Sequence, residues 1–172
     1  MTRLSTPSPR GAVPLFAKYL ADGAPDALYS ACFGGAVDAW ANTRRKKPSG
    51  EAFELTMKVL EATPRTKTRP TANGLGMAGL AIAKAAPDNE DDRAWAKAAK
   101  PWFRRERLLK VLEGLAMDAN ASDDVRFSAV FDLTKLGVPG STFARLSKEC
   151  AKSGDACGGI VRSAIDDAVK AK

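Results

Sequence analysis

Apolar residues recur along most of this chain at intervals of three and four residues, the spacing that places side chains on one face of an α-helix. The strongest pattern lies in residues 102–119, where the apolar stripe consists of Leu108, Val111, Leu112 and Leu115. Strict alternation of apolar and polar residues, as in a half-buried strand, is missing. The pattern predicts an all-α protein, a multi-helix orthogonal bundle of about seven to nine helices.

Changes in composition divide the 172 residues into four parts. We expect a flexible N-terminal tail at 1–11, an N-terminal helical segment at 12–63, a basic linker at 64–74 and a C-terminal helical domain at 75–172. The linker, with the sequence RTKTRPTANG, has no hydrophobic pattern, which makes it the best candidate for a hinge. A chain of this length can bury roughly two-thirds of its unfolded surface, so the core needs no disulfide or metal.

Capping and stop residues set the expected ends of the helices. Ser49 and Ser122 are predicted N-caps, and Gly137 is a natural stop because glycine readily adopts a positive φ. The predicted helices cover 13–20, 25–40, 51–62, 75–86, a short segment ending at 99, 102–119, 123–136, 141–151 and 155–172.

Three cysteines and the absence of histidine limit the chemistry of the chain. Cys32, Cys150 and Cys157 show no CxxC spacing, and we predict that they act as small buried thiols in a reducing compartment. Without an imidazole there is no Ser-His or Cys-His pair. We therefore expect no enzymatic activity, no metal site and no cofactor.

The N-terminal residues lack the apolar core of a secretory signal, and the longest apolar stretch, 74–86, is too short to span a bilayer. We therefore expect no membrane association. The predicted location is cytoplasmic, in the interior of a bacterial or host cell, with association with a virion as an alternative.

The net charge of +7 is concentrated in two clusters. Residues 41–71 carry eight basic against three acidic side chains, and residues 97–110 carry six against one, so each cluster has a net charge of +5. Such clusters favour nucleic acid, an anionic membrane or an acidic protein as partner, and clustered cations strengthen phosphate binding without sequence preference. The candidate DNA-binding residues from these clusters are Arg44, Arg45, Lys46, Lys47, Arg104 and Arg105.

Two aromatic residues, Trp102 and Phe103, precede the arginines of the second cluster. They could stack on an unpaired base, as aromatic residues do in proteins that bind single strands. They could instead anchor the start of a helix in the core, which is the interpretation that we favour.

The stretch LTKLGVPGSTFARLSKE, residues 133–149, predicts two helices joined at Gly137. Leu133, Leu136, Phe143 and Leu146 are placed to pack the two helices together. The outer face would carry Ser141, Thr142, Arg145 and Lys148, whose side chains suit contacts with phosphates and bases. A plain packed corner between two helices would produce the same pattern, so both interpretations stay open.

Within this stretch, LGVPGSTFARL resembles the turn and recognition helix of helix-turn-helix DNA-binding proteins, in which a pattern LGVSxSTVxRxL is common. The longer segment RLLKVLEGLAMDANASDDVRFSAVFDLTKLGV resembles the helical hairpins of small terminase subunits of tailed phages, with Arg126, Ala129 and Leu133 supplying their R…A…L pattern. The second resemblance implies a ring-forming, non-enzymatic subunit that recognises viral DNA and hands it to a packaging motor.

The sequence therefore predicts a non-enzymatic protein that binds duplex DNA, either a viral packaging subunit or a regulatory protein, and a homo-oligomer is compatible with both. The alternative is a helical protein-interaction module, such as a virion component, an adaptor or an inhibitor, that binds an acidic protein partner. Its exposed apolar patch would consist of Trp40, Met57, Met77 and Trp102.

Overall fold

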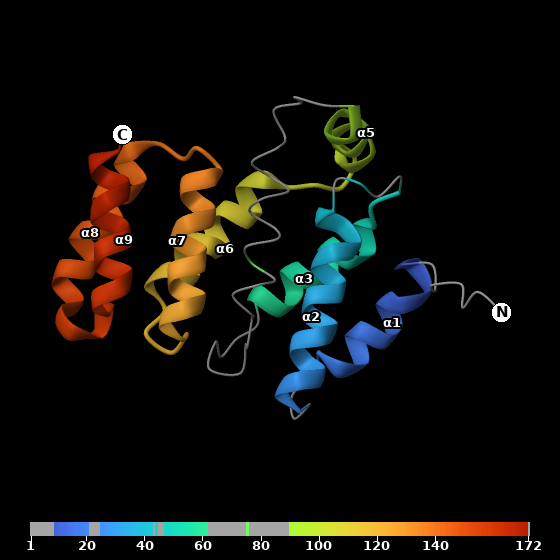
Figure 1. The fold of residues 1–172 in the computed structure, drawn as a ribbon, viewed down its shortest axis with the longest axis horizontal. Coiled ribbons are helices and arrows are strands. Elements are labelled where there is room, and N and C mark those ends of the chain that lie inside the picture. Colours follow the sequence, from blue (N-terminus) through green and yellow to red (C-terminus); the bar gives the residue numbers. More distant parts are fainter. Residues whose placement is uncertain are drawn as a thin grey trace, which may run out of the picture.

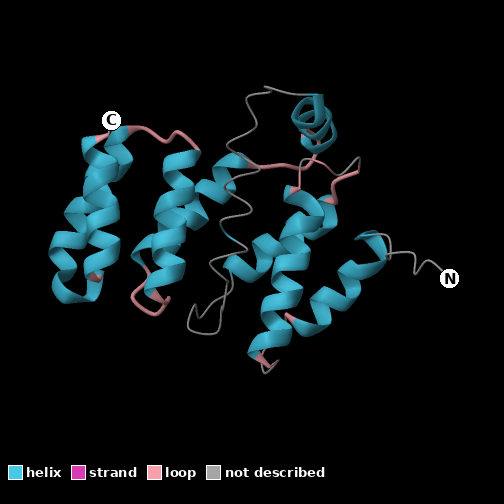
Figure 2. Cartoon of the chain, viewed as in Figure 1, coloured by secondary structure: helices cyan, strands magenta, loops and turns pink. Residues whose placement is uncertain are grey.

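The computed structural model describes residues 9–20, 25–42, 44, 47–61, 75 and 90–171. These ranges contain helices and connecting turns but no strand (Figure 2), which confirms the all-α class and the expected number of helices. The helices are α1 (Pro9–Tyr19), α2 (Asp26–Ala41), α3 (Gly50–Glu61), α5 (Glu90–Ala99), α6 (Arg105–Met117), α7 (Asp123–Lys135), α8 (Gly140–Ser153), the short 3-10 helix η2 (Gly154–Cys157) and α9 (Gly159–Lys170).

The helices form two groups joined by α6 (Figure 1). The first group contains α1, α2 and α3, which pack on one another, and α5 lies across their upper end. In the second group α9 packs against both α7 and α8, and α6 packs mainly against α7. Viewed as in Figure 1, α7, α8 and α9 run side by side, with α7 and α9 pointing in the same direction and α8 in the opposite one.

Several helix ends differ from the prediction. Helix α1 begins at Pro9, so the last three residues of the expected flexible tail are helical. Helix α6 begins at Arg105 rather than at residue 102, because the chain turns at residues 100–102 around Pro101. Helix α9 begins at Gly159 because residues 154–157 form η2 instead of a first helical turn. The predicted linker at 64–74 and all but Leu75 of the predicted helix at 75–86 lie outside the described residues.

One hydrophobic cluster extends from Tyr29 in α2 to Ala168 in α9 and so joins both groups of helices. Two buried indoles connect the helices of the first group. The Trp40 Nε1–H donates to Thr56 Oγ1 of α3 at 3.1 Å, and the Trp95 Nε1–H of α5 donates to the Trp40 carbonyl at 2.6 Å. Both indoles are thus partnered inside the core, as buried tryptophans require.

Two further aromatic residues complete this core at the start of α6. Trp102 and Phe103 are half-buried, and each ring packs against Phe53 and Trp95. A Cβ at Gly50 would lie 2.8 Å from Cγ of Trp102, so a residue without a side chain is needed where α3 begins. These contacts support the favoured role of the two aromatic residues as core anchors.

The prediction of an exposed apolar patch for a protein-interaction module is wrong for two of its four residues. Trp40 and Met57 have no exposed surface. Trp102 is half-buried, and Met77 lies outside the described residues. The periodicity of the sequence placed these large apolar residues on helices but could not tell which face the other helices would cover.

The caps of α3 and α7 were predicted correctly. The hydroxyl of Ser49 accepts from the Ala52 amide at 3.2 Å, and that of Ser122 accepts from the Val125 amide at 3.4 Å. Arg126 is buried and donates from Nε to the Ala116 carbonyl at 3.2 Å. This contact joins the end of α6 to the start of α7, so the arginine of the R…A…L pattern has a packing role in this hairpin.

Two of the three cysteines are joined. Cys150 of α8 and Cys157 of η2 form a disulfide with their Cα atoms 5.2 Å apart, so the prediction of free thiols is wrong for this pair. The sequence did not indicate this pairing, because the two residues are brought together by a turn that includes Gly154 with a positive φ of 57°. Cys32 is a free, buried thiol, and burial raises its pKa.

Candidate nucleic-acid interface

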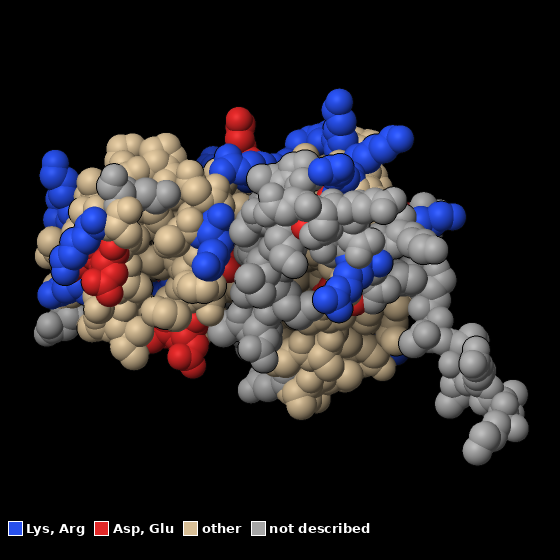
Figure 3. All heavy atoms as spheres, turned by 45° about the horizontal axis from the view of Figure 1, so that its top comes forward, with Lys and Arg blue, Asp and Glu red and all other residues tan. Residues whose placement is uncertain are grey.

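Basic side chains gather along one edge of the molecule, the upper edge in Figure 1. Figure 3, which turns this edge toward the viewer, shows lysine and arginine side chains over α5 and the neighbouring connections. We call this surface the basic edge. Its exposed members are Arg44, Lys47, Lys97, Lys100 and Arg104. The predicted residues Arg45 and Lys46 lie between two of these positions in the chain but outside the described residues.

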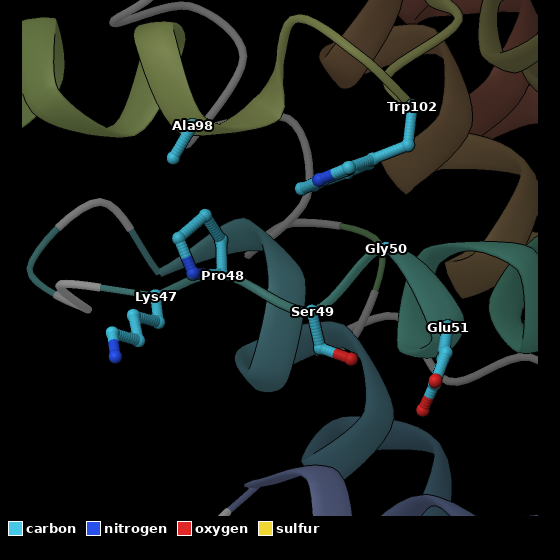
Figure 4. A pocket seen from close by; sticks show the side chains of 7 residues that line it. All are labelled: Lys47, Pro48, Ser49, Gly50, Glu51, Ala98 and Trp102. Atoms are coloured by element: carbon cyan, nitrogen blue, oxygen red, sulfur yellow. The ribbon is translucent and has the colours of Figure 1, made fainter.

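A pocket shows that the two chain segments that carry the basic clusters meet in space. It has a volume of about 400 Å³ and is lined from the α2–α3 connection by Lys47 and Pro48 and from the other side by Ala98 and Trp102. In Figure 4 the Trp102 ring extends into the space, while the charged ends of Lys47 and Glu51 point away from it. The charged ends of Lys47 and Glu51 therefore lie at the rim of the pocket (Figure 4).

The arginines at the start of α6 differ in their surroundings. The guanidinium of Arg104 donates to the carbonyls of Pro101 and Phe103, which hold it at the surface without neutralising its charge. Arg105 donates to the carbonyl of Leu136, the last residue before the predicted corner. The structure thus brings the start of α6 beside the connection between α7 and α8.

Arg107 belongs to the second basic cluster of the sequence but not to the basic edge. It donates to both carboxylate oxygens of Glu61, at 2.8 and 2.7 Å, and to Glu54 at 2.8 Å. These hydrogen bonds, first to Glu61 and then to Glu54, raise the pKa of the guanidinium. Two carboxylates of α3 therefore offset this positive charge.

The predicted corner is present as a turn between α7 and α8. Gly137 has a φ of 64°, a conformation that glycine adopts without strain. The four apolar residues selected to pack the corner, Leu133, Leu136, Phe143 and Leu146, are all buried. On the outer side, Ser141, Arg145 and Lys148 are exposed and Thr142 is half-buried.

The packing around this corner involves a third helix. Helix α8 makes its main contacts with α9 and fewer with α6, and α9 in turn packs on α7. In a helix-turn-helix the second helix is held directly by the first. Here α9 supports both, so the orientation of α8 depends on the C-terminal helix.

Arg145, the central residue of the predicted recognition helix, is bound to carboxylates. It donates to Glu113 of α6 and, at 3.5 Å, to Glu149 one turn further along α8. The hydrogen bond to Glu113 is the main cause of the raised pKa of this guanidinium. Arg145 would have to exchange a carboxylate for a phosphate or base in order to bind DNA.

The sequence interpretation omitted two features of the molecular surface. Lys97 and Lys100 were counted in the second cluster but not selected as binding residues. Phe127 and Phe131 lie on the outer side of α7, 41% and 43% exposed, and were not recognised as surface residues. The sequence could have indicated their exposure, because they are four residues apart and do not belong to the buried stripe Val125–Ala129–Leu133.

Among the residues that the structure describes, no group of three or more metal-ligating side chains lies together. Within the same ranges, no helix combines the length and apolar character needed to cross a bilayer. The fold and surface define an all-α protein with a basic edge. Comparisons with protein-family models, with curated proteins and with solved structures gave no match to this chain.

Proposed function

We propose that this protein is a non-enzymatic DNA-binding protein that holds the phosphate backbone of a duplex with its basic edge. The observation that carries the proposal is that the two chain segments with the basic clusters meet at the pocket lined by Lys47 and Trp102. Exposed lysines and arginines on one surface release counterions when they neutralise phosphates, which favours binding.

The start of α8 would extend this surface. The corner is adjacent to the start of α6, since Arg105 contacts Leu136. Ser141 and Thr142 lie in the first turn of α8, where side-chain hydroxyls suit phosphate contacts. Within this proposal the protein is either a viral packaging subunit or a regulatory protein. Both roles require it to bind DNA, in the cell interior or in a virion.

The basic edge can be tested with the double substitution Arg44→Ala/Lys47→Ala. We expect weaker binding to a duplex, because two exposed cations no longer neutralise phosphates. The slope of log K against log salt should become shallower by roughly two, at about 0.9 for each phosphate that is no longer neutralised. Fluorescence anisotropy with a labelled duplex over a range of salt concentrations measures both effects.

A matched control removes the same charge elsewhere. Lys18 of α1 and Lys58 of α3 are exposed and do not belong to the basic edge, so Lys18→Ala/Lys58→Ala should leave the slope nearly unchanged. Equal effects of both variants would show that only net charge matters. Absence of binding to any duplex at low salt would reject DNA binding in favour of the alternative, an acidic protein partner.

The corner requires its own test because Arg145 is ion-paired. If α8 contacts DNA, Arg145→Ala should weaken binding, by roughly 1–3 kcal/mol if the arginine contacts a base. Glu113→Gln should strengthen binding, since it releases Arg145 from its carboxylate. The anisotropy assay can compare both variants with Lys152→Ala, which removes an exposed charge from the last turn of α8. Unchanged affinity in both Arg145→Ala and Glu113→Gln would exclude the corner from the interface.

A further inference from the structure

An apolar groove lies between α7 and α9, away from the pocket of the basic edge. It has a volume of about 320 Å³. Two large residues of α7, Phe127 and Phe131, line one side, and Ala164, Asp167 and Ala168 of α9, with Ala171 directly after it, line the other. The two phenylalanines are exposed, whereas Ala164 is half-buried and Ala168 is buried.

Exposed apolar residues concentrate on these two helices. Six large apolar side chains are exposed in the described part of the chain, and four of them, Phe127, Phe131, Ile160 and Val169, belong to α7 and α9. Ile160, at 60%, is the most exposed of the six. Two of these four, Phe127 and Phe131, line the groove, and contiguous exposed apolar surface of this kind marks a contact site for a partner.

The charges on α7 lie at opposite ends of its aromatic stripe. Asp124 precedes Phe127 by three residues, and Lys135 follows Phe131 by four, so all four lie on one face of the helix. The Lys135 ammonium is 5.1 Å from the centroid of the Phe131 ring and therefore leans toward the groove. Along α7 the order of this face is acid, Phe, Phe, base. In an antiparallel second copy the order is reversed, so that acid faces base and Phe faces Phe.

We propose that a second copy of this chain docks on the α7–α9 groove in an antiparallel arrangement related by a two-fold axis. Asp124 and Lys135 lie about 16 Å apart along α7 at 1.5 Å per residue. A two-fold axis at their midpoint, beside Ala129, places Asp124 of each copy opposite Lys135 of the other. The same axis brings Phe127 of one copy close to Phe131 of the other.

Helix α9 runs beside α7 in the same direction (Figure 1). A Cβ at Gly158, before α9, would lie 2.9 Å from a carboxylate oxygen of Asp123, so the starts of α7 and α9 are adjacent. Lys170 lies in the last turn of α9, as Lys135 does in α7. Asp167, which lines the groove, pairs with Lys170 at 3.8 Å, so the acid-to-base order of this surface is carried by α7. This surface is self-complementary, as a two-fold interface requires.

The inference is independent of DNA binding, because the groove and the basic edge share no residue. Sedimentation equilibrium of the full chain, without nucleic acid, measures the dimer dissociation constant. We expect a dimer for the unsubstituted chain and a dissociation constant raised about a hundredfold or more by Phe131→Glu. Leu15→Glu, an equal change at an exposed apolar residue of α1, should leave the constant unchanged.

Charge exchange tests the antiparallel geometry. Asp124→Lys alone and Lys135→Asp alone each place like charges opposite each other at both ends, and each should raise the dissociation constant about tenfold. The double variant restores opposite charges and should return the constant to within about twofold of its original value. Circular dichroism of every variant shows whether the fold is retained.

Three outcomes would overturn the proposal. The first is a monomer of the unsubstituted chain at all protein concentrations. The second is a dimer that persists unchanged in folded Phe131→Glu. The third is a double charge variant that dimerises no better than the two single variants, which would reject the antiparallel register. A higher oligomer that Phe131→Glu disrupts, but that the double charge variant does not restore, would also reject the antiparallel register.

Discussion

Asp132 lies in the middle of α7 with none of its surface exposed, and neither carboxylate oxygen has a hydrogen-bond partner within the part of the chain that the structure describes. Burial raises the pKa of this carboxyl to about 8. The unfolded chain, with an ordinary pKa near 3.9, releases this proton at a much lower pH than the folded chain does. Folding therefore binds a proton between these two values, and stability falls as the pH rises through this range.

The substitution Asp132→Asn tests this account. Because asparagine does not titrate, the variant should lack the part of the pH dependence due to Asp132, a loss of up to about 1.4 kcal/mol per pH unit between roughly pH 4 and pH 8. The variant should thus gain stability relative to the unsubstituted chain as the pH rises. Urea unfolding at several pH values measures the free energy of unfolding. Parallel pH profiles of the two proteins would contradict a raised pKa at Asp132, and Asp167→Asn, at an exposed carboxyl, is the control.

At the scale of elements, the connection from α8 to α9 depends on several local constraints. The disulfide between Cys150 and Cys157 closes the turn, and Gly154 and Gly158 have positive φ values of 57° and 74°. Arg162 of α9 donates to the Gly154 carbonyl at 2.8 Å. Since α9 supports both α7 and α8, this short connection influences the position of the predicted recognition helix.

Removing the disulfide should destabilise the protein by about 2 kcal/mol, because the reduced chain no longer closes a short loop in the unfolded state. Urea unfolding of Cys150→Ala/Cys157→Ala measures the loss, and a reducing agent should have a similar effect on the unsubstituted protein. Cys32→Ala should retain the sensitivity to the reducing agent, since that thiol is free. Equal stability with and without the reducing agent would show that the disulfide contributes nothing to folding.

On the scale of the whole molecule, one core supports two surfaces of different chemistry. The basic edge lies over α5 and the neighbouring connections (Figure 3), and the apolar groove lies between α7 and α9. The net charge of +7 does not reveal this separation, because paired arginines such as Arg107 contribute to the sum without being available to a ligand. In the proposed dimer the antiparallel two-fold axis would place the two basic edges at opposite ends of the assembly.

Local features were predictable from the sequence because they depend on neighbouring residues. The all-α class followed from the helical spacing of apolar residues. The caps at Ser49 and Ser122 and the turn at Gly137 depend on backbone groups within a few positions, so residue type was sufficient to locate them. The exposure of Ser141 and Lys148 also followed from helical periodicity.

Contacts between residues distant in the chain were decided by the tertiary structure alone. Arg145 pairs with Glu113, and Arg107 pairs with Glu61, in each case across two different helices. The sequence therefore could not show which basic side chains are left to bind a ligand. Phe127 and Phe131 are exposed because the other helices cover the opposite side of α7. Helical periodicity determines which residues share a face, whereas the packing of all helices determines which face is left in water.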